Sequence, residues 1–437
     1  MNFLKSTILT VVTNVLLMFT AVAATIITSR MLGSYGKGVL AVSTNILSFS
    51  IIIFGLGFAA SNVYFVGEDK NNTRKIAYIN IMISCMSIIV LIPLYILNMK
   101  YNFAIFKGVN NLILIVVMVT IPFLNLKSSL INVLLGMQEI VEYNKVNLID
   151  KVLTLIMLVF AILLYKNPLS VIISNFISVL FILVFVLNKI NKKTEGIYTF
   201  DIKLFKRMLA YGIKAQIGNL VQLMNYRVNI FIINYFLAIN QVGIYSNAVA
   251  LGETLWQISG SIATVVFPMT TGSKNKEELK YFINKVTRIS FTLIIIFSII
   301  LALISDKVIY ILFGKEFMEA SKALMFLLPG ISIFSISNIL SNYMAGVAKI
   351  QYNIYSSMIS FAFTMVFNLI LVPRIGISGA AIATSLSYIV FTICAIFFYK
   401  KITKSKLKDI IIIKKEDISE IVGFIKSKLK RQGKDVV

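Results

Sequence analysis

Long apolar runs, separated by short polar stretches, dominate the sequence. A helix needs about 20 mostly apolar residues to cross the hydrocarbon core of a bilayer. The chain is 58% hydrophobic and 14% charged, whereas soluble domains contain about 25% charged residues. We therefore predict an all-α membrane protein with twelve transmembrane helices. The predicted spans are residues 8–28, 38–66, 76–97, 111–136, 146–165, 169–188, 209–237, 241–268, 286–305, 320–345, 352–372 and 379–399.

The distribution of lysine and arginine predicts how these spans are oriented. Loops on the cytoplasmic side of a membrane protein carry an excess of both residues. If the N-terminus is inside, the inside segments contain 29 of the 42 lysines and arginines, and the outside loops contain 8. We therefore expect both termini in the cytoplasm. The net charge of +24 then reflects topology and attraction to anionic membrane lipids, and we expect no nucleic-acid partner.

The second half of the chain repeats features of the first half at a nearly constant offset. Gly38 and Gly243 each follow a leucine by six positions and are 205 positions apart. The segments Phe106–Pro122 and Phe313–Pro329 have equal lengths and are 207 positions apart. Two halves of six spans enter the membrane from the same side, and substrate sites are expected between such repeats. We therefore predict two pseudo-symmetric six-helix lobes around a central cavity. Their bounds are 1–188 and 209–399, with a cytoplasmic linker at 189–208 and a basic cytoplasmic tail at 400–437.

Several motifs resemble those of a known exporter superfamily. The most specific are "YGIKAQIGNLVQLMNYRVNIFIINYFLAINQVGIYSNAVALGETLWQISGSIATVVFP" and "PRIGISGAAIAT". Two shorter ones are "SRMLGSYGKGVLAVSTNI" and "LFGKEFMEASKALMFLLPG". The likeness extends over nearly the whole chain to about residue 400. The chain thus resembles the O-antigen and capsule branch of the MOP (multidrug/oligosaccharidyl-lipid/polysaccharide) exporter superfamily.

This resemblance implies a flippase for lipid-linked oligosaccharides in the bacterial cytoplasmic membrane. The implied substrate is an undecaprenyl-pyrophosphate-linked repeat unit, which moves from the inner to the outer leaflet by alternating access for surface polysaccharide biosynthesis. The resemblance also implies a V-shaped cavity lined mainly by spans 1, 2, 7 and 8. A polysaccharide polymerase and other assembly proteins are the implied partners. Many relatives carry aspartate where this chain has Asn229, so proton and sodium coupling both stay open.

The seventh span, 209–237, has one polar face. At 100° per residue, an apolar side faces away from an amide-rich side that Arg227 borders. An arginine that faces lipid at mid-span costs about 2.5–3.5 kcal/mol, so we expect Arg227 to face water or protein. Amides can bind sugar hydroxyls and arginine can bind a pyrophosphate, but both can also join helices. We favour a sugar-binding wall, with helix–helix bonding as the alternative.

Other charged and aromatic residues lie inside the predicted spans. Glu253 in span 8 is predicted to lie at about the same depth in the membrane as Arg227. It is therefore the predicted partner of Arg227. Lys127 and Asp150 lie in two consecutive spans that one inside loop connects. We therefore predict that they form a buried ion pair. The predicted substrate-binding residues are Arg227, Gln216, Asn219, Gln222, Tyr226, Asn229, Trp256 and Arg30, and the predicted charge-pair or ion-coupling residues are Glu253, Lys127 and Asp150.

No catalytic residue, metal ligand or cofactor is predicted, and the sequence contains no histidine. It also contains no GxxxxGK[ST] phosphate loop, so we expect transport without ATP consumption by the chain itself. In the tail, Ile418, Ile421, Val422, Ile425 and Leu429 follow a helical stripe. This pattern predicts an amphipathic helix on the inner leaflet, N-capped near Asp417 and Glu420, with a disordered basic tail as the alternative.

Two other functions compete with this interpretation. A drug–cation antiporter of the same superfamily would favour acidic residues in its cavity, whereas the charges inside these spans are mostly basic. A membrane glycosyltransferase, such as a polymerase or ligase, usually needs a sizeable outside loop with catalytic groups. The predicted outside loops are short, and no acid–base pair converges in them.

Overall fold

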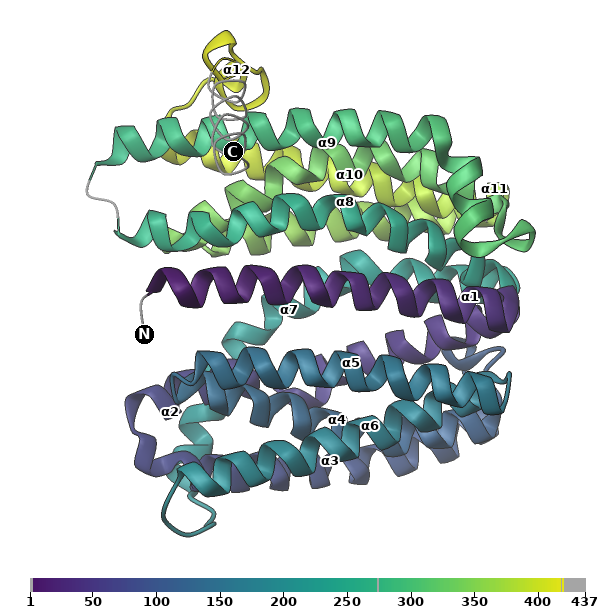
Figure 1. Cartoon of the computed structure of the whole chain (residues 1–437), viewed down its shortest axis with the longest axis vertical. Helices are drawn as coiled ribbons and strands as arrows, with labels where there is room; N and C mark the ends of the chain where they lie inside the picture. The colour runs from purple at the N-terminus through teal and green to yellow at the C-terminus, as the bar shows by residue number, and fades with distance from the viewer. Residues whose placement is uncertain (1–2, 273–274, 418, 420–437) are drawn as a thin grey trace, which may run out of the picture. The chain divides into compact units, whose positions relative to one another are not determined.

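The computed structural model describes residues 3–272, 275–417 and 419, and these ranges form helices and loops without a β-strand. The all-α prediction is therefore confirmed. The helices are α1 (Phe3–Gly55), α2 (Phe58–Glu68), α3 (Thr73–Tyr101), α4 (Asn111–Gly136), α5 (Ile140–Leu164), α6 (Pro168–Lys193), α7 (Ile202–Phe236), α8 (Ile239–Gly272), α9 (Lys276–Phe313), α10 (Glu319–Gly346), α11 (Gln351–Thr403) and α12 (Leu407–Ile411) (Figure 1). Three short 3₁₀ helices lie at Lys70–Asn72, Ala104–Phe106 and Lys315–Phe317.

Two of these helices each contain two spans. Helix α1 turns at Gly33 (φ 67°) and α11 turns at Gly376 (φ 62°), a backbone region that glycine adopts without steric cost. Eight helices, including α1 and α11, are long and apolar enough to cross a membrane. Together with α7 and α8, the described residues provide the twelve predicted spans. The protein is a multi-pass membrane protein.

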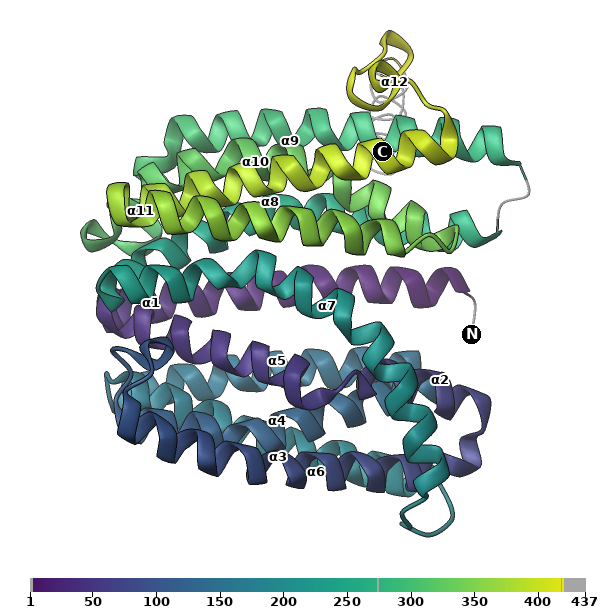
Figure 2. The same cartoon turned by 180° about the vertical axis from the view of Figure 1, so that it is seen from behind.

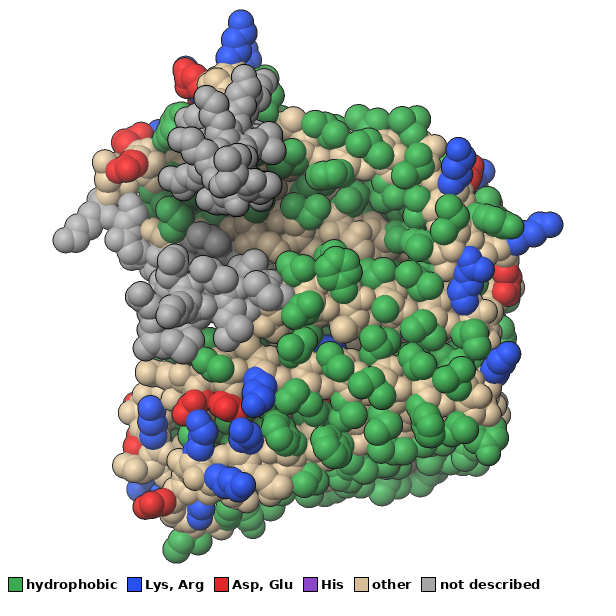
Figure 3. All heavy atoms as spheres, viewed as in Figure 1, with side chains coloured by type: hydrophobic (Ala, Val, Ile, Leu, Met, Phe, Trp, Pro, Cys, Tyr) green, Lys and Arg blue, Asp and Glu red, His purple; other side chains and the backbone are tan. Residues whose placement is uncertain are grey.

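The surface agrees with membrane insertion. In the lower part of Figure 3, hydrophobic side chains cover much of the surface around α5 and α6, and charged side chains gather at its left end. Large apolar residues of these two helices are exposed, such as Phe160 on α5 and Phe181 on α6, at 60% and 56%. Such a band would be an aggregation hazard in water. It suits a surface that is solvated by lipid chains.

Asparagine and aspartate residues fix several helix starts. The side-chain oxygens of Asn110, Asn167 and Asp201 accept hydrogen bonds from backbone N–H groups in the first turns of α4, α6 and α7. Helix α6 extends to Lys193, five residues further than predicted, because lysines in a last turn interact favourably with the helix dipole. The connection between α6 and α7 is therefore only residues 194–201. The lobe boundary in this region stays a prediction.

The chain divides into two compact units. Unit 1 contains residues 1–250, 306–323 and 365–380, and unit 2 contains residues 251–305, 324–364 and 381–437. Unit 1 is built on contacts of α4 with α2, α3 and α6, of α5 with α1 and α6, and of α7 with α1 and α2 (Figure 2). Its buried apolar core includes Phe58, Ile76, Leu130, Ile182 and Met208.

Glycines allow α7 to approach α1 and α2 closely. Gly57 (φ 75°) lies in the break between α1 and α2, and a Cβ atom there would be 2.0 Å from the carbonyl oxygen of Gly212. The hydroxyl of Ser61 donates a 2.7 Å hydrogen bond to the carbonyl of Met208. Small residues with backbone-directed hydrogen bonds are the usual contacts between membrane helices. They fix the N-terminal half of α7 against the broken second span.

A second close approach joins the equivalent glycines of the two repeats. A Cβ atom on Gly38 would be 1.9 Å from the carbonyl oxygen of Ile239, and one on Gly243 would be 2.1 Å from that of Ser34. The start of span 2 thus crosses the start of span 8 with backbone against backbone. Gly38 and Gly243 are the pair that the repeat aligned, so the duplicated halves meet here at equivalent positions.

Small polar residues also hold unit 2 together. The hydroxyl of Ser385 accepts a 2.7 Å hydrogen bond from the N–H of Gly330, and Asn338 donates a 2.9 Å bond to the hydroxyl of Ser259. A third contact joins the hydroxyls of Ser332 and Ser298 at 2.8 Å. These bonds connect α8, α9, α10 and α11 within the unit. They satisfy polar groups that hydrocarbon could not solvate.

Candidate functional site

The N-terminal half of the polar face of α7 is accessible. Asn219 and Gln222 are exposed, and Gln216 and Tyr226 are half-buried. Gln222 donates a 2.8 Å hydrogen bond to the hydroxyl of Tyr226. Gln216 donates a 2.8 Å bond to the carbonyl of Ile52 near the end of α1. These four predicted site residues therefore form a continuous, partly accessible polar strip along α7.

The C-terminal half of the same face is buried. Asn229 is 1% exposed and donates a 2.8 Å hydrogen bond to the hydroxyl of Tyr245 on α8. Asn234, also 1% exposed, donates a 2.8 Å bond to the carbonyl of Lys107. Here the amides join α7 to its neighbours, as the helix-bonding alternative expected. Asn229 thus has a structural partner and does not belong to the accessible strip.

Arg227 lies at the junction of these two regions. It is half-buried, one residue after Tyr226 and two before Asn229. The guanidinium group carries five N–H donors and is always charged, so it adds a permanent positive charge to a strip of neutral amides. Glu253, its predicted partner, is also half-buried but belongs to unit 2. The pairing of the two residues stays a prediction.

A small polar pocket adjoins the strip. Its volume is about 210 Å³, and it lies between the end of α1, the break at Gly57, α4 and α7. Gln216 and Asn219 line it from α7, and Asn125 lines it from α4. Asn125 is 4% exposed, and its Oδ1 atom has no hydrogen-bond partner in the described residues. A buried acceptor of this kind suits one small polar group, such as a water or a hydroxyl.

Lys127 and Asp150 form the buried ion pair that the sequence predicted. The Nζ atom of Lys127 on α4 lies 2.8 and 2.9 Å from the two carboxylate oxygens of Asp150 on α5. Both side chains are less than 10% exposed. The pair compensates two charges that the membrane could not solvate. Its role in ion coupling stays a prediction.

Arg30 has a different environment from the one that the sequence suggested. Its guanidinium group donates hydrogen bonds to the carbonyls of Tyr310, Ile311 and Leu312 at the C-terminal end of α9. Cations at helix C-termini are favourable because they compensate the unsatisfied carbonyls and the helix dipole. Arg30 is exposed, but its donors bind backbone here, and contact with a substrate stays a prediction.

Trp256 packs in an aromatic cluster of unit 2. Its ring centroid is 5.3 Å from that of Phe334 and 5.9 Å from that of Tyr388, and the latter two are 4.7 Å apart. Offset aromatic pairs at these distances are favourable. Trp256 therefore packs against α10 and α11, and stacking on a sugar stays a prediction. In the described ranges, no group of three or more Cys, Asp or Glu residues could hold a metal ion.

A second buried ion pair was missed by the sequence analysis. Arg288 of α9 and Asp417 of the tail are 1% and 0% exposed, and an Nη atom of Arg288 lies 2.7 Å from a carboxylate oxygen. Arg288 also donates a 3.2 Å bond to the carbonyl of Asp409 in α12. The pair fixes the segment after α11 onto α9. The predicted tail helix at 418–429 lies outside the described residues, apart from Ser419.

Replacement of Asp417 by asparagine should release this segment. Arg288 would lose its charged partner, which should lower the free energy of unfolding by on the order of 3 kcal/mol. Thermal unfolding of the purified protein would measure the loss. Glu416→Gln is the matched control, because Glu416 is exposed. Equal melting of Asp417→Asn and this control would contradict the prediction.

The same pair predicts a dependence on pH. The hydrogen bond from Arg288 lowers the pKa of Asp417 below its ordinary value of 3.8. A lowered pKa contributes stability above the ordinary value, and the contribution disappears as the pH falls through the lowered one. We expect the wild-type protein to lose this stability below about pH 4, and Asp417→Asn to show no such component in melting curves recorded between neutral and acidic pH.

The sequence profile described as "Polysaccharide biosynthesis protein" matches residues 6–322, which is more than half of the chain. The chain belongs to this family. The match extends from α1 to the start of α10, so it includes the complete polar strip of α7 and the Lys127–Asp150 pair.

Curated relatives share part of this length. This chain is 28% identical over 169 residues to the probable low-salt glycan biosynthesis flippase Agl15 of Haloferax volcanii. The match covers 38% of this chain and 36% of that protein. The chain is 26% identical over 211 residues to the capsular polysaccharide biosynthesis protein CapF of Staphylococcus aureus, covering 47% and 52%. The matches thus span about a third to a half of the relatives' lengths.

Solved structures share the fold of this chain over nearly its whole length. The lipid II flippase MurJ in an inward closed conformation superposes with a TM-score of 0.80 at 16% identity, covering 92% of this chain and 89% of that one. An inward-facing multidrug resistance MATE family transporter of the MOP superfamily gives 0.72 at 14% identity, covering 89% and 94%. The two-lobe fold of MOP transporters is therefore the fold of this protein.

Proposed function

We propose that this protein is a flippase that moves a lipid-linked oligosaccharide across the membrane for polysaccharide biosynthesis. Membership of a polysaccharide biosynthesis family supports the pathway, and the fold shared with a lipid II flippase supports the transport step. The observation that carries the proposal is the partly accessible strip of Gln216, Asn219, Gln222 and Tyr226 with Arg227 at its end. Amides and a phenol suit sugar hydroxyls, and a guanidinium group suits a phosphate.

The finer proposal concerns substrate and location. The substrate is an undecaprenyl-pyrophosphate-linked repeat unit, and the protein works by alternating access in the bacterial cytoplasmic membrane with both termini inside. In this proposal Arg227 binds the pyrophosphate and the strip contacts the sugar. A polymerase and other assembly proteins would use the product on the outer leaflet. Transport needs no ATP hydrolysis by the chain and uses a proton or sodium gradient.

Variants of Arg227 test the proposal. Arg227→Lys keeps the charge but loses the planar fork, so transport should fall about tenfold while protein levels hold. Arg227→Ala should reduce transport about a hundredfold, because charge-assisted hydrogen bonds contribute roughly 1.5–3 kcal/mol each. The measurement is the appearance of a labelled undecaprenyl-pyrophosphate-linked sugar on the far leaflet of liposomes that contain the purified protein and no nucleotide.

Lys214→Gln is the matched control, because Lys214 is an exposed cation on the same helix. It should transport like the wild type. Normal transport by Arg227→Ala at normal protein levels would remove the arginine from the substrate site. An absolute requirement for ATP in the liposomes would refute the transport mechanism as proposed.

A drug–cation antiporter is the second candidate, because the fold also superposes on a multidrug transporter. Such a protein would carry organic cations, for which a strip that ends in an arginine is electrostatically unfavourable. Ethidium efflux from cells that express the protein distinguishes the two functions. If cells that express the Arg227→Ala variant still export ethidium, the result would favour the antiporter.

A further inference from the structure

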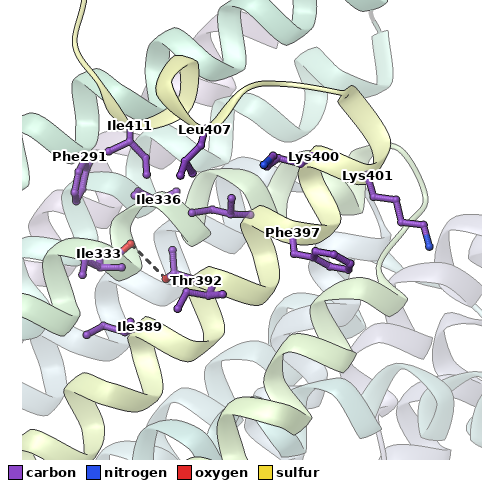
Figure 4. Close-up of a pocket in the computed structure, with 12 residues that line it drawn as sticks. Phe291, Ile333, Ile336, Ile389, Thr392, Phe397, Lys400, Lys401, Leu407 and Ile411 are labelled. Carbon is purple, nitrogen blue, oxygen red and sulfur yellow. Dashed lines mark hydrogen bonds between the residues drawn. The ribbon is translucent and has the colours of Figure 1, made fainter.

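Unit 2 contains a groove of about 680 Å³ at the end of α11 where the tail begins. Phe291 of α9, Ile336 of α10 and Ile393 of α11 form its walls. Leu407 and Ile411 of α12 close one side (Figure 4). No residue of the polar strip of α7, which belongs to unit 1, lines this groove.

The interior of the groove offers only hydrocarbon to a ligand. Among the described residues that line it, Thr392 is the one polar side chain apart from two lysines, and its hydroxyl already donates a 2.9 Å hydrogen bond to the carbonyl of Tyr388. Several lining side chains are nevertheless open to the outside, such as Ile393 at 59% and Phe397 at 63%. An apolar, accessible cavity of this kind suits an alkyl chain that enters from the surrounding lipid.

The two lysines give the groove a charged mouth. Lys400 and Lys401 line it at the end of α11, and both are exposed. In Figure 4, Lys400 reaches toward the space below α12 and Lys401 extends beside Phe397. In the described part of the chain, neither ammonium group forms an ion pair. Basic groups beside an apolar groove match a ligand with an anionic head and a hydrocarbon tail.

The volume indicates which tail fits. If a methylene group needs about as much space as a water molecule in the liquid, roughly 30 Å³, the groove holds about 20 such groups. That is the size of one phospholipid acyl chain and much less than a polyprenyl carrier. We propose that the groove binds one anionic phospholipid, with an acyl chain between α9, α10 and α11 and its phosphate on Lys400 and Lys401.

The groove depends on the position of the tail segment, because α12 forms one of its sides. Leu407 and Ile411 reach the groove because α12 is held by the bond from Arg288 to the carbonyl of Asp409 and by the Arg288–Asp417 pair. A lipid in the groove therefore contacts α12 as well as the membrane helices. The bound phospholipid is a structural partner of this unit and is independent of the proposed substrate.

Native mass spectrometry of the purified protein with added phosphatidylglycerol tests the inference. One lipid should bind with higher affinity than the rest, and phosphatidylcholine with the same chains should bind weakly. Lys400→Gln with Lys401→Gln should lower the affinity of that lipid about thirtyfold, since each lysine near a phosphate contributes roughly fivefold. Ile393→Trp should also lower it, because the ring occupies the groove without changing any charge.

Lys406→Gln with Lys408→Gln is the matched control, because these exposed lysines flank the groove without lining it. This variant should keep the tightly bound lipid. Equal losses in the two double variants would overturn the inference in favour of general electrostatic attraction. Displacement of phosphatidylglycerol by an equal concentration of undecaprenyl phosphate would also overturn the inference. Glycerol phosphate, which has no hydrocarbon tail, should not displace the bound lipid.

Discussion

Replacement of Gly38 by alanine should prevent the protein from reaching normal levels in the membrane. A Cβ atom at this position would lie 1.9 Å from the carbonyl oxygen of Ile239, and contacts below 3.0 Å force a neighbour to move. The neighbour is backbone, and Gly243 makes the reciprocal contact on Ser34 at 2.1 Å, so neither helix can yield alone. We expect a loss of about 3 kcal/mol or more, at the upper end of overpacking effects. Thermal unfolding in detergent would measure it.

Gly260→Ala is the matched control, because no atom lies within 4 Å of a Cβ atom built there. It should be neutral or stabilising by up to about 1 kcal/mol, since alanine is the better helix former. Gly243→Ala should behave like Gly38→Ala. If Gly38→Ala melts at the same temperature as Gly260→Ala, the two spans do not cross at this distance in the folded protein.

The contacts around these glycines show how the duplicated halves are joined within unit 1. Arg30, at the end of the first span of the first half, bonds to the end of α9 in the second half. Asn234, at the end of the first span of the second half, bonds to the carbonyl of Lys107 in the first half. The end of the first span of each half thus contacts the region between the third and fourth spans of the other half. The repeat, first detected as an offset of about 205 residues, has a physical counterpart in these exchanged contacts.

The spans could be predicted from the sequence because hydrocarbon imposes one requirement on all of them. Apolar runs of about 20 residues must be helical there, since no water satisfies the backbone. The turns at Gly33 and Gly376 lie in the predicted connections 29–37 and 373–378, but the structure has helix on both sides of a short non-helical turn where the sequence predicts a longer loop. Lys127 and Asp150 could be paired because their helices are consecutive and share one short loop.

The remaining site contacts depend on tertiary packing that periodicity does not encode. The 100° rotation per residue placed Asn229 and Gln222 on one face of α7, but only the neighbouring helix decides that Asn229 meets Tyr245 while Gln222 stays exposed. The Arg288–Asp417 pair joins residues 129 positions apart. Its only signal in the sequence was an arginine at the start of the predicted span 286–305 and one of the five acidic residues in a basic tail.

The second large effect is expected at the Lys127–Asp150 pair. Asp150→Asn should leave the Lys127 ammonium buried without a counter-charge and lower the free energy of unfolding by about 3–5 kcal/mol. Lys127→Met should cost a similar amount, because it leaves the Asp150 carboxylate unpaired. The double variant Lys127→Met with Asp150→Leu removes both charges and fills similar volume, so it should melt close to the wild type. A double variant as unstable as the single ones would contradict this account of the pair.

Transport by the double variant then separates the two roles of the pair. If the pair only compensates charge inside the membrane, the folded double variant should transport the labelled lipid-linked sugar at the wild-type rate. If the pair couples transport to an ion, the double variant should fold and lose the response to an imposed proton or sodium gradient. The distinction holds because protonation or cation binding needs the Asp150 carboxylate, whereas packing between α4 and α5 needs only side chains of the right volume.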